Sequence, residues 1–162
     1  MPAGSGRPVW SLFAGLVGVI VVADQLTKAW LVSAIQPGAS VAVIGDLVRL
    51  VDSQNGGGLF GLLQGQAPVF AALSLLVIAG IVAYHARAGH DPLLSLALGL
   101  LLGGAIGNLV DRLHYGYVVD FVDAGIGTFR WYTFNVADAA ISCAIVLLLL
   151  IAVRPAPRAV PG

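Results

Sequence analysis

Four long apolar segments divide the chain into alternating apolar and polar stretches. They cover residues of about 9–30, 67–84, 93–110 and 137–153, and charged side chains are scarce within them. Each segment is close to the roughly 20 residues that an α-helix needs to cross the hydrocarbon core of a bilayer. Trp10 and Trp30 lie at the two ends of the first segment, as interfacial aromatic residues do. The pattern predicts an α-helical polytopic membrane protein with four transmembrane helices.

The two longer connections, about 31–66 and 111–136, contain strand-like patterns. Valines and leucines on both sides of Gly45-Asp46 predict a short hairpin, and residues 117–122 form a second strand-like run. We therefore expect a small extracytoplasmic β element between spans 1 and 2. Residues 1–153 are expected to form a single integral-membrane domain, followed by a proline-rich, disordered tail at 154–162.

The first apolar segment also permits a different interpretation. Arg7 followed by the fifteen apolar residues 9–23 has the layout of a cleaved signal peptide. However, Val21 stands where a cleavage site would need a small residue, and the helical pattern continues through Lys28. We therefore interpret the segment as the first membrane span.

The amino-acid composition is typical of a membrane protein and not of a soluble one. Apolar residues make up 59% of the chain and charged residues only 10%, whereas soluble proteins carry about 25% charged residues. The formal net charge is zero and no run of Lys or Arg occurs, so nucleic acid is not an expected partner. The single cysteine, Cys143, excludes a disulfide within the chain, and we interpret it as a small buried hydrophobic residue.

The orientation depends on small differences in charge. Four spans place both termini on one side, and the basic residues divide equally between that side (Arg7, Arg87, Arg154, Arg158) and the other (Lys28, Arg49, Arg112, Arg130). Lys28 and Arg112 have acidic neighbours, and seven of the eight aspartates lie away from the terminal side. These features favour cytoplasmic termini and outward-facing longer connections.

Polar residues gather at the predicted outer ends of the spans. Asp24 and Lys28 stand four residues apart, as in an ion pair on one helix face. Asn108, Asp111 and Arg112 share a face where the third span emerges. Upstream on that span, Gly99, Gly103 and Gly107, beside Gly104, form a stripe of the kind that lets helices pack closely.

Two aspartates could form a catalytic pair. Asn135 and Asp138 have the spacing of a capping box at the start of the fourth span, which places Asp138 at the edge of the apolar core. Asp120 interrupts an apolar strand-like run. Two carboxylates that share one proton supply a base to activate water and an acid to protonate a leaving group. Their separation of eighteen residues leaves their contact open.

The sequence lacks the residue patterns that a metalloprotease or a phosphate-binding loop would need. No His-Glu-x-x-His occurs, and His85, His90 and His114 are dispersed, so no metal ion is expected. Gly56-Gly57-Gly58 is not followed by the Lys of a phosphate loop. We interpret it as a flexible turn, beside which Asn55 could present its amide to a substrate backbone. No cofactor is expected.

Five motifs together resemble one family. They are, in order, Asp24-Gln25-x-x-Lys28, Asn55-x-Gly57-x-x-Phe60, Gly103-Gly104-Ala105-x-Gly107-Asn108-x-x-Asp111-Arg112, Val118-Val119-Asp120-Phe121 and Phe134-Asn135-x-Ala137-Asp138. The chain resembles the lipoprotein signal peptidase (signal peptidase II) family over about residues 9–153. It departs from the family at Gly58-Leu59, where a pair of small residues, often Ala-Ala, usually precedes the Phe.

The resemblance implies an aspartyl endopeptidase of the bacterial cytoplasmic membrane that removes signal peptides from prolipoproteins. It implies cleavage before a diacylglyceryl-modified cysteine at the outer face, with Asp120 and Asp138, rather than Asp123, as catalytic residues. The positions that would bind substrate or shape the site are Asp24, Lys28, Asn55, Gly104, Asn108, Asp111, Arg112, Asn135 and Ala137. Its partners would be prolipoproteins and membrane lipid, and we expect a monomer. The substrate's signal helix is expected to pair with the glycine-rich face of the third span.

Two other classes of function are considered. A small ion or proton transporter would relay ions through Asp24, Asp111, Asp120 and Asp138, and it predicts acids near the middle of the bilayer. In the sequence these acids gather at one face. A non-catalytic membrane assembly protein would need only the glycine stripe and would leave the acids without a role.

Overall fold

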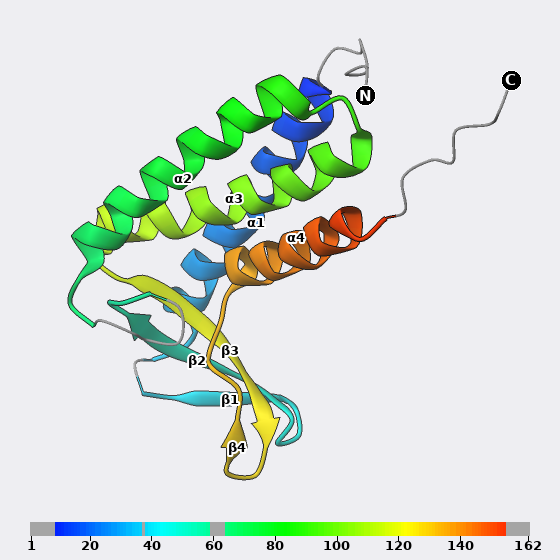
Figure 1. Ribbon diagram of the computed structural model, residues 1–162. Helices are drawn as coiled ribbons and strands as arrows, with labels where there is room; N and C mark the ends of the chain where they lie inside the picture. The colour runs from blue at the N-terminus through cyan, green and yellow to red at the C-terminus, as the bar shows by residue number, and fades with distance from the viewer. Residues whose placement is uncertain (1–8, 37, 59–63, 155–162) are drawn as a thin grey trace, which may run out of the picture.

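The computed structural model describes residues 9–36, 38–58 and 64–154 and contains four long helices and a small sheet (Figure 1). The helices are α1 (Trp10–Ala34), α2 (Ala67–Ala88), α3 (Pro92–Tyr115) and α4 (Val136–Ala152). The first three are long and apolar enough to cross a membrane. With 17 residues, α4 lies at the lower limit of length for a span. Leu59, Phe60 and residues 155–162 of the predicted tail lie outside the described residues.

Local signals in the sequence define the helix ends. The side chain of Asp91 accepts a hydrogen bond from the backbone N–H of Leu93 at 2.8 Å and caps α3, which begins with Pro92. The same helix ends at Gly116, whose φ of +78° is a left-handed conformation that glycine adopts without strain. The expected capping box at Asn135 and Asp138 is present at the start of α4. The expected first span is one uninterrupted helix through Asp24 and Lys28.

Helix α3 lies in the middle of the bundle, with α1, α2 and α4 packed around it (Figure 1). A Cβ atom at Gly103 would lie 2.8 Å from the Cβ of Ile20 in α1, and one at Gly104 would lie 2.5 Å from the carbonyl oxygen of Ala137 in α4. The glycine stripe therefore packs helices of this chain together. The expectation that a substrate helix pairs with this stripe was wrong, because α1 and α4 already cover it.

The sheet consists of β1 (Ser40–Ile44), β2 (Val48–Asn55), β3 (Val118–Ile126) and β4 (Phe129–Arg130), in that order and antiparallel throughout. The hairpin expected around Gly45 is β1–β2, and the strand expected at 117–122 lies in β3. The β element is not confined to the connection between spans 1 and 2, because β2 pairs with β3 of the later connection. That pairing satisfies backbone groups that would otherwise form an open sheet edge.

The sheet is attached to one end of the bundle, beyond the last turns of α1 (Figure 1). Leu31 and Ile35 of α1 form a buried apolar cluster with Val119 and Phe121 of β3. The start of α1 and the end of α4 lie at the opposite end of the bundle. The packing of α1 against β3 fixes Asp120, which lies between Val119 and Phe121, beside the ends of the helices.

Candidate active site

Asp120 is held on β3 by amide groups from two other segments. Its carboxylate accepts hydrogen bonds from Asn135 Nδ2 at 2.7 Å and from Asn55 Nδ2 at 3.2 Å. The side chain is 3% exposed. Asn55 was expected to offer its amide to a substrate backbone, but in the structure that amide contacts Asp120. Its Oδ1 accepts the backbone N–H of Gly57 at 3.0 Å, so the glycine turn orients the amide.

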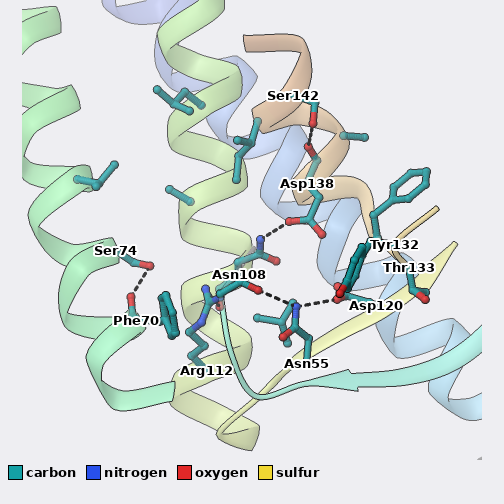
Figure 2. A pocket seen from close by; sticks show the side chains of 18 of the residues that line it. Asn55, Phe70, Ser74, Asn108, Arg112, Asp120, Tyr132, Thr133, Asp138 and Ser142 are labelled. Atoms are coloured by element: carbon teal, nitrogen blue, oxygen red, sulfur yellow. Dashed lines mark hydrogen bonds between the residues drawn. The ribbon is translucent and has the colours of Figure 1, made fainter. Parts of the chain in front are cut away.

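Asp138 lies in the first turn of α4 and is joined to Asp120 through Asn135. The Oδ1 of Asn135 accepts the backbone N–H of Asp138 at 2.9 Å, while Asp138 Oδ2 accepts the backbone N–H of Asn135 at 3.3 Å. Asn108 of α3 donates its amide to Asp138 Oδ1 at 2.8 Å (Figure 2). The two aspartates, eighteen residues apart in the chain, thus share Asn135 as a neighbour and line one cavity.

A buried ionic network lies behind the two aspartates. Lys28 Nζ is 2.8 Å from Asp24 Oδ2 and 2.8 Å from Asp111 Oδ2, and all three side chains are at most 4% exposed. Lys28 Nζ also donates to Asn108 Oδ1 at 3.3 Å. Burying two carboxylates is costly unless a cation and hydrogen bonds compensate them, and Lys28 provides that compensation.

The same network holds the backbone next to each candidate catalytic residue. Asp24 Oδ1 accepts the N–H of Ala137 at 2.9 Å, and Asp111 Oδ2 accepts the N–H of Val119 at 3.0 Å. Ala137 precedes Asp138 and Val119 precedes Asp120. The ion pair expected from the sequence between Asp24 and Lys28 is therefore part of a larger arrangement that positions both aspartates.

Arg112 lies at the wall of the cavity. Its guanidinium donates to the backbone carbonyls of Gly57 at 3.2 Å and Asn108 at 3.4 Å, and it lies 5.6 Å from the centre of the Phe70 ring. The acidic neighbour expected for Arg112 does not form an ion pair with it among the described residues. The guanidinium instead joins α3 to the glycine turn and to α2.

The surroundings of Asp120 favour its protonated form. Burial and the nearby charge of Asp138 both raise the pKa of this carboxyl, whereas the hydrogen bonds from Asn55 and Asn135 and the charge of Lys28 lower it, and together they bring it to about 7. Two carboxyl groups that hold one proton between them can act as an acid and a base at the same pH. The arrangement therefore has the electrostatics of an acid–base pair.

The cavity in front of the two aspartates has a volume of about 690 Å³ and is bordered by α2, α3, α4 and the segment before α4. Its apolar walls include Phe70, Leu73 and Val77 of α2 and Leu101 and Ala105 of α3. In α3 these two residues lie on the face that carries Asn108 and Arg112 rather than on the glycine stripe. The cavity combines an apolar surface with two carboxyl groups at one end.

Cys143 borders this cavity and is exposed. The interpretation of Cys143 as a buried residue was wrong, because only one face of the apolar helix α4 packs against the other helices and Cys143 is not on that face. Within α4, Ala140 and Ala144 are buried against the bundle, whereas Cys143 is exposed.

Comparison with known proteins identifies the family. The family model described as signal peptidase (SPase) II matches residues 16–154 of the chain. The chain belongs to the signal peptidase II family. A "Lipoprotein signal peptidase" of Syntrophomonas wolfei subsp. wolfei is 40% identical over 146 residues, which cover 90% of this chain and 95% of that protein. One of Moorella thermoacetica is 44% identical over 135 residues, which cover 82% and 87%.

A solved structure agrees in fold with this signal peptidase II. It is described as a bacterial membrane enzyme structure determined by the in meso method at 2.3 Å resolution. The TM-score is 0.85 at 26% identity, with 91% of this chain and 90% of that chain covered. The structural likeness therefore extends to the sheet as well as to the helices.

In this signal peptidase II, the residues expected from the sequence lie together. Lys28 links Asp24 and Asp111, while Asn108 and Asn135 contact one another and the two candidate aspartates. Asp123 lies apart and pairs with Arg130 at 2.9 Å. The other residues expected at the site are Asn55 and Arg112 at the cavity wall and Gly104 and Ala137 at the contact of α3 with α4.

Sequence reasoning missed several residues of the site. Gln25 donates to Asp111 Oδ1 at 2.9 Å, and its position beside Asp24 in an apolar span was a signal that could have found it. Phe70, Tyr132 and Thr133 line the cavity, but an aromatic residue or a threonine in these segments carries no distinctive pattern.

Proposed function

We propose that this signal peptidase II hydrolyses prolipoproteins with Asp120 and Asp138 as its catalytic pair, cutting before a diacylglyceryl-modified cysteine. The observation that carries the proposal is that the Asn135 side chain hydrogen-bonds to both aspartates, at one end of an apolar cavity. Signal peptide removal from prolipoproteins is the activity of the family to which the chain belongs.

The chemistry follows from a pair that carries one proton. The ionised carboxylate takes a proton from a water molecule, whose oxygen attacks the carbonyl carbon of the residue before the cysteine. The protonated carboxyl donates its proton as the C–N bond breaks, which leaves a carboxylate on the signal peptide and a free amino group on the cysteine. A pKa of about 7 for Asp120 keeps one proton available near neutral pH.

The proposal includes an orientation of the protein in the membrane. We place residues 1–153 in one integral-membrane domain with α1–α4 as four spans, cytoplasmic termini and the sheet at the outer face. The basic residues on the sheet side are largely neutralised, since Lys28 pairs with Asp24 and Asp111, and Arg130 pairs with Asp123. This orientation also places Arg87 and Arg154 on the cytoplasmic side, where Lys and Arg are enriched in membrane proteins.

The cavity suits a lipid-modified signal peptide. Helices α2 and α4 both contact α3, while the apolar cavity is bordered by residues from all three. A signal helix that enters between α2 and α4 would contact Leu101 and Ala105 of α3, and the acyl chains would remain next to lipid. The acids lie together at one end of the bundle, an arrangement that does not suit an ion relay through the bilayer.

The test is cleavage of a diacylglyceryl-modified prolipoprotein by purified protein in detergent. Asp120→Asn and Asp138→Asn should each reduce kcat by about 10²–10⁴-fold, the usual contribution of a positioned acid or base. Asp123→Asn is the matched control, because Asp123 lies on the same strand but pairs with Arg130 outside the cavity. A chelator should have no effect. Normal cleavage by either folded active-site variant would overturn the assignment.

A further inference from the structure

A second, smaller cavity lies against Asp120. It has a volume of about 170 Å³, and four residues border both this cavity and the larger one: Asn55, Asp120, Tyr132 and Thr133. In Figure 2, Thr133 lies on one side of Asp120, whereas Phe70 and Arg112 lie on the other. Asp120 therefore stands in the wall between two spaces.

The smaller cavity differs from the larger one in chemistry. The residues that border it alone are Ser53, Gln54 and Gln64, all of them polar. The larger cavity has walls of leucine, valine and phenylalanine. At roughly 30 Å³ for each water molecule in the liquid, the smaller space corresponds to about six waters. It is more polar than the larger cavity, is partly open to the surroundings, and has room for a short stretch of backbone with small side chains.

The geometry of the sheet points Ser53 at this space. Ser53 of β2 and Asp120 of β3 are cross-strand partners, so their side chains lie on the same face of the sheet. On the other edge of β3, Phe134 exchanges backbone hydrogen bonds with Val122, which holds the segment containing Thr133 along the strand. Among the described residues, neither hydroxyl group donates a hydrogen bond to the protein. Both are thus available to a ligand.

We infer that this polar cavity, between Ser53 of β2 and Thr133, binds the polypeptide that follows the modified cysteine. The inference rests on the proposed function. The signal peptide and the acyl chains are apolar and match the larger cavity, whereas the chain after the scissile bond belongs to a water-soluble protein. Once the bond lies at Asp120, that chain continues on the far side of Asp120. Peptide N–H and C=O groups there would hydrogen-bond to the two hydroxyls, and the volume selects small side chains.

The first test uses the wild-type enzyme and varies only the substrate. Prolipoproteins with Gly, Ser or Trp directly after the modified cysteine are compared, and kcat/KM should fall at least about tenfold for Trp. The same substitution to Trp six residues further on should have no effect, because that position lies beyond a cavity of this size. Equal kcat/KM for Gly, Ser and Trp would overturn the inference.

The second test combines enzyme and substrate changes. Ser53→Val and Thr133→Val should each lower kcat/KM by about 2- to 10-fold, the size of one neutral hydrogen bond. The loss should appear with Gly or Ser after the cysteine and be absent with Trp, because a chain that the cavity excludes does not reach the two hydroxyls, whereas a general structural defect would affect all substrates equally. The matched controls are Ser40→Val on exposed strand β1 and Thr128→Val in the exposed turn after β3. Losses that are the same for every substrate would contradict the inference.

The two proposals fail in different ways. If Asp120→Asn cleaves normally, the catalytic pair is wrong, and a subsite defined by its position against Asp120 is wrong with it. If Asp120→Asn is inactive but cleavage does not depend on the residue after the cysteine, the subsite alone is wrong. If a Val variant does not fold, the substrate series with the wild-type enzyme decides.

Discussion

The carboxylate of Asp111 accepts the backbone N–H of Val119 at 3.0 Å, one residue before Asp120. Asp24 makes the equivalent contact with Ala137, one residue before Asp138, and Lys28 lies between the two carboxylates. Three charged residues that do not line the cavity thereby set the positions of the two residues that do. Sites of this kind need their supporting residues held as tightly as the reacting groups.

Removing Lys28 should destabilise the fold as well as the site. Lys28→Met leaves two buried carboxylates without a cation, and the loss of one partner from a buried pair typically costs about 3–5 kcal/mol. We expect a large fall in Tm in detergent and a loss of cleavage. Asp111→Asn should be milder than Asp111→Leu, because an amide oxygen can still accept the N–H of Val119.

The control for these changes is Asp91→Asn at the start of α3, because asparagine caps a helix as well as aspartate does. It should leave Tm and kcat unchanged. Should Asp111→Leu behave like Asp91→Asn in both measurements, the network would have no positioning role.

The pKa of Asp120 predicts how stability depends on pH. Its value of about 7 in the folded protein is above its ordinary value of 3.8, so between these pH values the folded state binds more protons than the unfolded state. The contribution of Asp120 to the free energy of unfolding therefore falls as pH rises from about 4 to 7 and is constant above that. Asp120→Asn removes this loss.

The measurement is Tm of wild type and Asp120→Asn in detergent between pH 4 and 8. The variant should be the more stable protein at pH 8, and its advantage should shrink as the pH falls toward 4. Asp123→Asn, which loses an ion pair with Arg130, should gain no stability at pH 8. A Tm difference that does not change with pH would contradict the raised pKa.

Much of the fold could be predicted from the sequence because the signals are local. Apolar length indicated the helices, Asn135 and Asp138 have the spacing of a capping box, and the valines around Gly45 indicated the hairpin. The pairing of β2 with β3 could not be predicted, because it joins segments more than sixty residues apart through backbone groups that every sequence carries. Because that pairing could not be predicted, the hydrogen bond from Asn55 to Asp120 could not be predicted either.

Which residues belong to the site could be predicted better than how those residues are arranged. The motifs that resemble the family include Asp24, Lys28 and Asp111, but they do not show that two of these carboxylates bind backbone N–H groups. Periodicity also failed to show which face of α3 borders the larger cavity. Leu101 and Ala105 are ordinary apolar residues, whereas the glycines that drew attention are covered by α1 and α4.

Gly104→Ala should damage the enzyme through helix packing. An added Cβ would lie 2.5 Å from the carbonyl oxygen of Ala137 and 2.6 Å from Ile141, so α4 must move away from α3. Because Asp138 is in the first turn of α4, that movement displaces it from Asn108. We expect lower Tm and at least a tenfold loss of kcat.

Gly80→Ala is the control, because a Cβ there meets nothing within 4 Å. It should leave both Tm and kcat close to the wild-type values. The packing argument fails if the two alanine variants cannot be distinguished.

Cys143 offers a direct view of what fills the larger cavity. It is the only cysteine of the chain, it is exposed, and it borders the cavity. A bound signal helix should therefore shield its thiol. In the inactive Asp138→Asn variant, saturating diacylglyceryl-modified prolipoprotein should slow labelling of Cys143 by a small, membrane-permeant maleimide at least tenfold. The control is Leu149→Cys in a Cys143→Ala, Asp138→Asn background. Leu149 is 62% exposed on the same helix and does not border the cavity, so its labelling should not respond to substrate. Equal protection at both positions would indicate nonspecific shielding by the substrate or its detergent, and no protection at Cys143 would place the signal helix elsewhere on the enzyme.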